Sequence, residues 1–187
     1  MTKAEIEQKL KDTLGAEKII WLPYGIYNDE TNGHIDNICA FTSETDVVLA
    51  WTDDENDPQY KLSSACLKAL ENSTTADGRK ITVHKLPLPK PVLITEHECE
   101  GLDTMDGLPT RTANERLAAS YVNFYISNGA IVMPFFNDKN DEIARNILAS
   151  LFPTREVIGV YARDILIGGG NFHCLTQQIP LGMPFIK

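Results

Sequence analysis

The feature that most constrains the fold of this chain is an internal repeat. The segment DENDP at 54–58 returns as DKNDE at 138–142, an offset of 84 residues. Each copy comes just after an apolar stretch of strand character and just before a stretch with helical spacing. A repeated unit of this size cannot bury its apolar face alone, so the repeat predicts at least two α/β units that pack against neighbours.

In the first unit, the pattern predicts two strands, a helix and a third strand. The helix is expected to begin at Asp57-Pro58, because proline suits the first helical turn, and to end near Glu71. The expected strands are 37–43, 47–52 and 81–86.

The second unit repeats this order. Asn128-Gly129 separates its first two strands and favours a type I′ hairpin, in which both central residues need positive φ. The expected strands are 121–127, 130–136 and 156–161, and the expected helix runs from about Asp141 to Leu151, before Pro153.

The two ends of the chain read as parts of further units. Thr2 and Glu5 have the pattern of a capping box ahead of a helix over 3–14, and Gly15 is a stop signal for that helix. A strand is expected over 18–23, and new strands from about Ile165.

These ends are interpreted as the tail of a preceding unit at 1–23 and the start of a closing unit at 162–187. Complete units are expected at 36–86 and 116–161. The chain is therefore predicted to be part of a ring of units. Its two ends should present apolar edges that another chain or segment covers.

Composition and charge narrow the function classes. A formal net charge of -9 over 187 residues argues against nucleic-acid and anionic-membrane partners and is compatible with a cationic ligand. No apolar run approaches the eighteen or so residues of a membrane span, and the polar start does not resemble a signal peptide. The four cysteines lack CxxC or zinc-finger spacing, so we expect reduced thiols, a cytoplasmic location and no metal site.

Cys174, close behind the glycine run 168–170, is the candidate nucleophile. In a ring of repeats, equivalent connections converge on the central axis, so the connection at 28–37 and the one at 168–174 are expected to meet. His34 would then serve as the base for Cys174. The alternatives are a cysteine that merely packs beside a turn and His173 as base, although neighbouring side chains on an extended segment face opposite ways.

The other three cysteines are weaker candidates for the nucleophile. Cys66 falls on a helix with apolar neighbours, Cys39 in a strand, and Cys99 in a polar loop. The residues His97 to Cys99 are too isolated for a ligand cluster, and 51–58 is interpreted as a solvated, helix-capping turn rather than a metal site.

Carboxylates near His34 suggest the chemistry of a ligand. Asp36 would share a face with His34 if this segment is extended, and carboxylates hold planar guanidinium groups through two hydrogen bonds. Asp29 and Glu30 lie just upstream, and Asp29 fits a turn-forming role better than a ligand-binding one.

Four stretches carry a resemblance to a known family: LPYGIYNDETNGHIDNICAF, LAWTDDENDPQY, RLAASYVNFYISNGAIVMPFF and GGGNFHCLTQQIP. They closely resemble agmatine deiminase, of the guanidino-group-modifying (pentein) superfamily built on a five-bladed α/β propeller. The resemblance runs over essentially the whole chain. It implies about half of such a propeller and a hydrolysis of agmatine to N-carbamoylputrescine and ammonia in polyamine synthesis, without metal or organic cofactor.

The resemblance also implies roles for particular residues. Cys174 matches the nucleophile that forms an amidino-cysteine intermediate, and His34 matches the general acid and base. Asp36 matches a carboxylate that grips the guanidinium. Glu30 would help to hold the substrate, while Gly169 and Gly170 would let the backbone approach it.

Length sets this chain apart from the family, whose members are roughly twice as long. The resemblance implies that the chain is the C-terminal half, and that the other half supplies a tryptophan-bearing loop and further acidic residues. Activity would then need a complementary N-terminal half, and contact through the open propeller edges, including homo-oligomer formation, is expected. The alternatives are a related arginine or peptidyl-arginine deiminase and a catalytically incompetent fragment that binds a partner.

Overall fold

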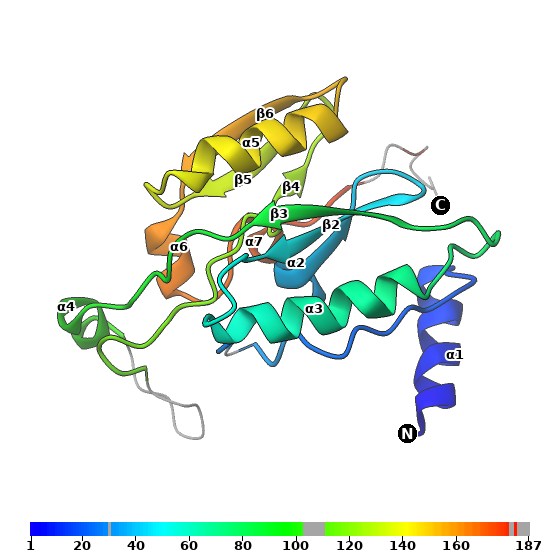
Figure 1. Cartoon of the computed structure of the whole chain (residues 1–187), viewed down its shortest axis with the longest axis horizontal. Coiled ribbons are helices and arrows are strands. Elements are labelled where there is room, and N and C mark those ends of the chain that lie inside the picture. The colour runs from blue at the N-terminus through cyan, green and yellow to red at the C-terminus, as the bar shows by residue number, and fades with distance from the viewer. Residues whose placement is uncertain (30, 103–110, 180–181, 183–187) are drawn as a thin grey trace, which may run out of the picture.

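The computed structural model describes residues 1–29, 31–102, 111–179 and 182, and shows a mixed α/β fold with two three-stranded sheets (Figure 1). The first sheet contains β1 (Cys39–Phe41), β2 (Asp46–Trp51) and β3 (Thr82–Pro87) in that order. Strands β1 and β2 are antiparallel, whereas β2 and β3 are parallel and are connected through α3 (Pro58–Glu71). The first sheet therefore has the predicted order of strand, strand, helix and strand.

The second sheet has the same topology. It contains β4 (Tyr125–Ile126), β5 (Ala130–Phe135) and β6 (Glu156–Tyr161), and α5 (Asn140–Leu151) connects the parallel pair. The bounds of β5 lie 84 residues after those of β2, the offset found in the sequence. Helix α5 packs against both β6 and β3, and thus joins the two sheets.

Local signals account for the helices that begin and end where predicted. In α1 (Lys3–Leu14), Thr2 and Glu5 form the capping box, and Gly15 ends the helix with φ 68°. Asp57 caps α3 by accepting a hydrogen bond from the backbone of Gln59, and Pro58 follows it. No residue of α1 is buried, and the helix projects from the rest of the molecule (Figure 1).

The predicted type I′ hairpin is wrong, because neither Asn128 nor Gly129 has positive φ. The turn is closed by Ser127 instead. Its backbone N–H donates to the carbonyl of Ala130 at 2.9 Å, and its hydroxyl accepts from the Ala130 N–H at 3.2 Å. Ser43 makes the equivalent pair of hydrogen bonds in the first sheet, so the turn belongs to the repeat.

Three predicted strands are wrong in whole or in part. Segment 18–23 is in neither sheet, although Ile20 and Leu22 pack against the core, because a strand also needs a partner for its backbone. The segment 37–43 begins within a short helix, α2 (Ile35–Ile38), before β1. The segment 121–127 forms a turn before the two residues of β4.

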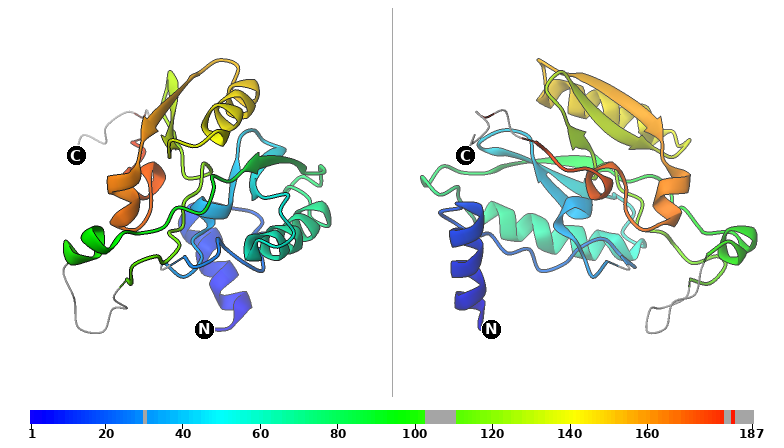
Figure 2. Two further views of the ribbon diagram at one scale, coloured as in Figure 1. Left: turned by 60° about the vertical axis from the view of Figure 1, so that its left-hand side comes forward. Right: turned by 180° about the vertical axis from the view of Figure 1, so that it is seen from behind.

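The chain after β6 continues as helix rather than as the predicted strands. Helices α6 (Arg163–Ile167) and α7 (Phe172–Leu175) occupy the region from about Ile165. Figure 2 shows, from behind, how this C-terminal segment crosses the molecule beside the first sheet. Residues 180, 181 and 183–187 of the predicted closing unit lie outside the described part.

One large core and a smaller cluster hold the fold together. Strand β2 forms the centre of the large core, and Val47, Val48, Leu49 and Ala50 are fully buried. A continuous apolar run of this kind is expected for a strand covered on both faces. The ion pair of Arg116 with Asp57, at 2.7 Å, ties the second half of the chain to the start of α3.

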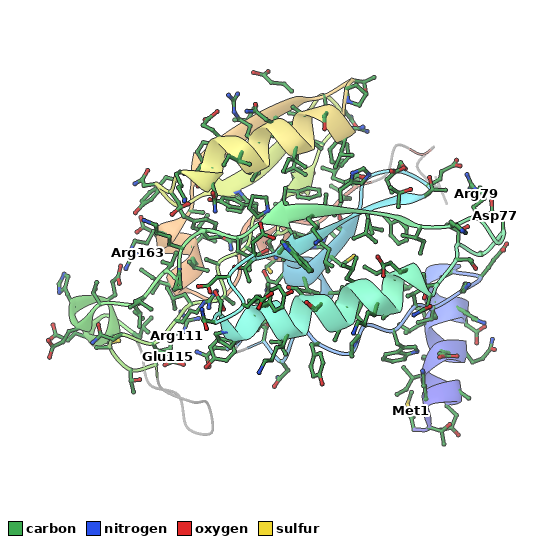
Figure 3. All side chains as sticks on the ribbon, viewed as in Figure 1. Met1, Asp77, Arg79, Arg111, Glu115 and Arg163 are labelled. Carbon is green, nitrogen blue, oxygen red and sulfur yellow. The ribbon has the colours of Figure 1, made fainter. Side chains whose placement is uncertain are left out.

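The smaller cluster lies under α6 and is bordered by α4 (Glu96–Glu100). Glu98 of α4 binds Arg163 at 2.6 Å, and Arg163 lies at α6 in Figure 3. Cys99 therefore lies on a helix rather than in the predicted loop. Among the described residues, no helix has both the length and the apolar character needed to cross a bilayer.

Candidate functional site

Cys174 lies on α7, where its sulfur contacts side chains from two distant segments. The thiol donates to Asp36 Oδ2 at 3.3 Å, and the side-chain amide of Asn123 donates to Sγ at 3.1 Å. Gly169 and Gly170 lead into this turn with φ of 91° and 111°. A Cβ at Gly170 would lie 2.7 Å from Sγ, so glycine is needed there for the chain to pass the thiol.

Asp36 is the carboxylate that contacts the sulfur of Cys174. Its Oδ2 accepts from Cys174 and also contacts His173 Nδ1 at 2.7 Å. Its Oδ1 is buried and has no hydrogen-bond partner among the described residues. A buried carboxylate oxygen without a donor is costly, so the carboxylate as a whole would gain from a cationic or N–H-bearing ligand.

The orientation predicted for His173 is wrong. His173 does not face away from the thiol, because both residues reach the same oxygen of Asp36. The prediction assumed an extended segment, whereas α7 is helical. Consecutive residues on a helix are only about 100° apart, which allows two neighbours to contact one acceptor.

His34 lies at the N-cap of α2, and its side chain is exposed. The segment from His34 to Asp36 enters a helix, so the expectation that these two side chains share the face of an extended segment is wrong. Within the described residues, no hydrogen bond joins the His34 imidazole to Cys174. The role of His34 as acid and base stays a prediction.

Asp29 organises the loop that precedes α2, as predicted for a turn-forming residue. Its Oδ1 accepts from the backbone and hydroxyl of Thr31 at 2.9 and 2.6 Å. Its Oδ2 accepts from the backbone of His34 at 3.2 Å, and Asn37 also reaches it. Glu30, the other predicted ligand-binding residue of this loop, lies outside the described residues.

Two buried asparagines beside Cys174 were missed by the sequence analysis. Asn123 is fully buried and contacts the sulfur, while Asn171 is fully buried and precedes α7. Both side-chain polar atoms of Asn171 lack a partner among the described residues. One feature of the sequence could have indicated Asn123. It lies within the apolar stretch YVNFYIS, where a buried strand rarely contains a polar amide side chain.

A cavity of about 310 Å³ lies beside the Asp36 carboxylate. Asp36, His173 and Gln178 form its polar part. Its apolar wall includes Val122, Phe124 and Ile126. A carboxylate next to an apolar wall suits a cation attached to an aliphatic chain.

The pKa of Cys174 lies above its ordinary value. Burial is the main cause, and the neighbouring Asp36 carboxylate adds to it. Hydrogen bonds from the Asn171 backbone and the Asn123 amide act in the opposite direction. The thiol is therefore protonated at neutral pH when no ligand is bound.

The remaining sequence candidates have structural roles. The turn at 51–58 caps α3 through Asp57, while Glu98 pairs with Arg163 and His97 is exposed. Within the described ranges, no three or more histidine, cysteine or acidic side chains are grouped so as to hold a metal ion.

Comparison with known proteins supports a common origin with agmatine deiminases. A protein of Latilactobacillus sakei whose name, agmatine deiminase, is itself provisional is 59% identical over 182 residues, which are 97% of this chain and 50% of the relative. A Listeria monocytogenes protein with the same provisional name is 55% identical over 97% of this chain and 50% of its own length. The chain thus spans about half the length of the curated relatives it matches.

Solved structures agree with the sequence matches. The agmatine deiminase of Enterococcus faecalis, described as catalysing its reaction, superposes with a TM-score of 0.91 at 38% identity, covering 96% of this chain and 49% of that one. The resemblance noted in the sequence is confirmed. The family model described as Porphyromonas-type peptidyl-arginine deiminase matches residues 1–180, and the chain belongs to this family.

Proposed function

We propose that this chain supplies the nucleophile and a guanidinium-binding carboxylate of an agmatine deiminase site. The reaction converts agmatine and water to N-carbamoylputrescine and ammonia, which we assign to putrescine and polyamine synthesis. The single observation that carries the proposal is the contact of Cys174 with Asp36, whose second oxygen is buried and has no hydrogen-bond partner in the described part of the chain. The sequence relatives named agmatine deiminase support the choice of substrate.

Binding comes first in the proposed mechanism. The substrate guanidinium donates to the Asp36 carboxylate, and its aliphatic chain extends along the apolar wall of the neighbouring cavity. Glu30 would hold the cationic end. Gly169 and Gly170, which carry no side chain, leave the backbone near the sulfur open to the planar group.

The bound cation then activates the thiol. Its positive charge neutralises Asp36 and offsets the effect of burial on the pKa of Cys174. The thiol pKa therefore falls, and the thiolate forms more readily. The thiolate attacks the guanidinium carbon and forms the S–C bond. The C–N bond to one amino group breaks, and the proton that left the thiol departs with ammonia.

Water completes the reaction. It attacks the carbon of the amidino-cysteine intermediate, the S–C bond breaks, and the sulfur recovers as the thiol. One proton of the water is released, and its oxygen becomes the carbonyl of the product. We assign the proton transfers to His34, two residues before Asp36, and keep His173 as the alternative because its Nδ1 already contacts Asp36.

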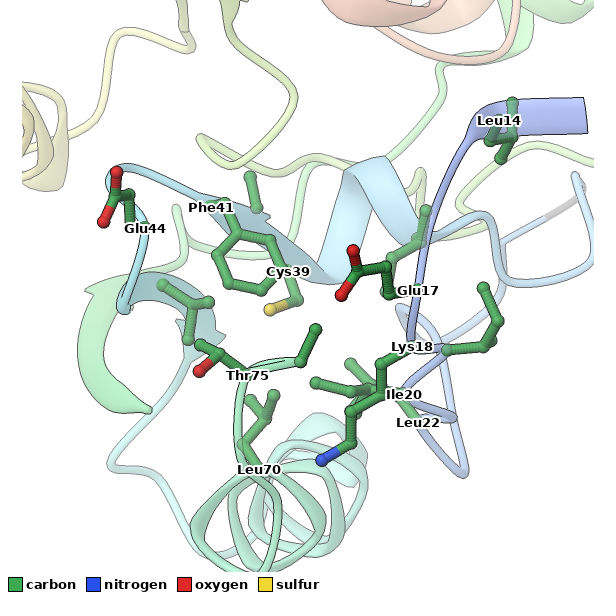
Figure 4. A pocket seen from close by; sticks show the side chains of 15 residues that line it. Leu14, Glu17, Lys18, Ile20, Leu22, Cys39, Phe41, Glu44, Leu70 and Thr75 are labelled. Atoms are coloured by element: carbon green, nitrogen blue, oxygen red, sulfur yellow. The ribbon is translucent and has the colours of Figure 1, made fainter. Parts of the chain in front are cut away.

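The remaining part of the site would come from outside the described residues. We propose that the chain is the C-terminal half of a five-bladed propeller and that a complementary half completes it. An apolar groove of about 560 Å³ between segment 17–22 and the first sheet is the surface we assign to this contact (Figure 4). Its border includes Leu14 and Phe41, which are both exposed.

A second candidate is deimination of arginine or peptidyl-arginine, favoured by the description of the family model that the chain matches. A third is a catalytically incompetent fragment that binds a partner through the same groove. Without a complete carboxylate clamp, misplacement of the substrate alone can cost about a hundredfold in rate. Activity of the isolated chain is therefore expected to be low.

The test measures ammonia release from agmatine, arginine and an arginyl peptide. The chain is assayed alone and together with the segment of the Latilactobacillus sakei relative that it does not cover. We expect release from agmatine in the mixture only, and its loss in Cys174→Ser. Preference for arginine or the peptide would favour the second candidate.

A haloacetamidine probe gives an independent readout, since its adduct on Cys174 is detected by mass spectrometry. If no adduct forms on Cys174 in the mixture and no substrate releases ammonia, the chain is not part of an enzyme and the third candidate stands.

A further inference from the structure

Asn123 connects the thiol to the rest of the fold through every polar atom of its side chain. Oδ1 accepts from the backbone N–H of His173 at 2.9 Å and of Cys174 at 3.3 Å. Nδ2 donates to Asn37 Oδ1 at 3.0 Å and to Cys174 Sγ at 3.1 Å. The two donors and the two acceptor positions of this fully buried amide are all used.

The orientation of the amide follows from its partners. Backbone N–H groups can only donate, so the oxygen of Asn123 must face the first turn of α7. The NH₂ group then faces the sulfur. A continuous series of hydrogen bonds runs from Asp29 through Asn37 and Asn123 to Cys174, which joins the loop before α2 to the reactive thiol.

We propose that Asn123 holds the Cys174 sulfur in its reactive position, by donating a hydrogen bond to Sγ and by fixing the backbone of α7. This inference rests on the proposed role of Cys174 as nucleophile. A donor at 3.1 Å favours the thiolate over the thiol, whereas Asp36 acts against it. The titratable groups that face the sulfur are Asp36 from α2 and, through the same carboxylate, His173 from α7.

Two substitutions separate the contact with sulfur from the anchoring of α7. Asn123→Asp keeps an oxygen for the two backbone N–H groups and replaces the donor to sulfur with an acceptor. Asn123→Leu has a similar volume and removes both functions. Tyr121→Phe is the matched control, because Tyr121 is also fully buried and loses its hydrogen bond to Asp141 without touching the sulfur.

The measurement is the rate of Cys174 alkylation by iodoacetamide against pH, in the 187-residue chain. Peptide mass spectrometry separates Cys174 from the other three cysteines. We expect the Cys174 rate at pH 8 to fall about tenfold in Asn123→Asp, which corresponds to a rise of one unit in the thiol pKa. In Asn123→Leu the alkylation rate of Cys174 should fall by a smaller factor. In Tyr121→Phe it should equal the rate of the unchanged chain. If both Asn123 variants keep the unchanged pH profile, the proposal is overturned.

A measurement on the unchanged chain covers the case in which the variants do not fold. The side-chain ¹⁵N and ¹H resonances of Asn123 should shift with pH at the midpoint of Cys174 alkylation, and this shift should vanish in Cys174→Ser. If the Asn123 chemical shifts do not change as the thiol ionises, the proposal is overturned. Neither readout requires turnover, so a chain that is inactive on every substrate can still show the Asn123 effect.

Discussion

Asp36 and Cys174 are 138 residues apart in the chain, yet the thiol of Cys174 lies 3.3 Å from the Oδ2 atom of Asp36. The contact has two opposing effects. Under the proposed function it places a carboxylate where the substrate guanidinium binds, and it adds to the burial that raises the pKa of the thiol. In the proposed mechanism, the thiol therefore reacts when a cation neutralises Asp36 and stays protonated when none is bound.

Asp36→Asn tests these two effects together. Removing the negative charge should lower the pKa of Cys174, so its alkylation by iodoacetamide at pH 7 should become roughly threefold to tenfold faster. Ammonia release from agmatine in the complemented mixture should fall at least about a hundredfold, because the guanidinium loses its carboxylate. Asp12→Asn, on the exposed helix α1, is the control that should change neither rate. Slower alkylation in Asp36→Asn would contradict the assigned geometry.

Gly170→Ala should destabilise the chain and displace Cys174. The new Cβ combines a φ of 111° with a contact of 2.7 Å to Sγ, and we expect a loss of about 1–3 kcal/mol in the free energy of unfolding. Gly78→Ala isolates the backbone effect, because Gly78 has φ 85° but open space around it. Urea unfolding gives both values. A loss no larger in Gly170→Ala than in Gly78→Ala would show that the sulfur does not limit this position.

Gly129→Ala tests the corrected turn between β4 and β5. A type I′ turn would make this substitution costly, whereas the observed turn has no positive φ at Gly129, and no atom of the described residues lies within 4 Å of the new Cβ. We expect an unchanged stability or a gain of about 0.4–1 kcal/mol from the less flexible unfolded chain. Thermal unfolding measures this change. In the same experiment Gly15→Ala, at φ 68° after α1, should lower the stability. Destabilisation by Gly129→Ala would restore the type I′ interpretation.

The ion pair between Glu98 and Arg163 should make stability depend on pH. The hydrogen bond from Arg163, followed by those from Thr95, lowers the pKa of Glu98 from 4.5 to about 2, so these contacts stabilise the fold above pH 4.5. This contribution is lost as the pH falls through about 2, where Glu98 protonates in the folded chain as well. Because both side chains are partly exposed, we expect Glu98→Gln to cost only about 0.5 kcal/mol at pH 7.

The control for this pair is Glu100→Gln on the same helix, which should have no measurable effect because Glu100 is largely exposed. Denaturant unfolding at several pH values gives the difference between each variant and the unchanged chain. A Glu98→Gln difference that grows as the pH is lowered from 4.5 would have the wrong sign for this ion pair.

The elements that were predicted correctly carry their signals locally. The capping box of α1, the Asp57-Pro58 start of α3 and the apolar run of β2 each depend on residues within a few positions of one another. The internal repeat, with its offset of 84 residues, also predicted the order of strands and helix in both sheets. Such patterns can be recognised in a single sequence because capping, helical spacing and strand alternation need no distant partner.

The elements that were missed depend on partners elsewhere in the chain. Segment 18–23 has the composition of a strand but no neighbour to pair with in either sheet. Helix α7 replaced an expected extended segment, because Asn123 binds two successive backbone N–H groups and favours a turn. This difference also reversed the predicted orientation of His173.

For the site, the sequence by itself determined which side chains to propose for the chemistry: a thiol behind a glycine run, and histidine and carboxylate groups in one loop. Only the tertiary structure decided which oxygen of Asp36 is occupied, that His173 shares it with Cys174, and that Asn123 donates a hydrogen bond to the sulfur. The physical reason is that reactivity depends on ångström-scale distances and on burial. Both are set by how helices α2 and α7 pack together, and residue order does not encode either of them locally.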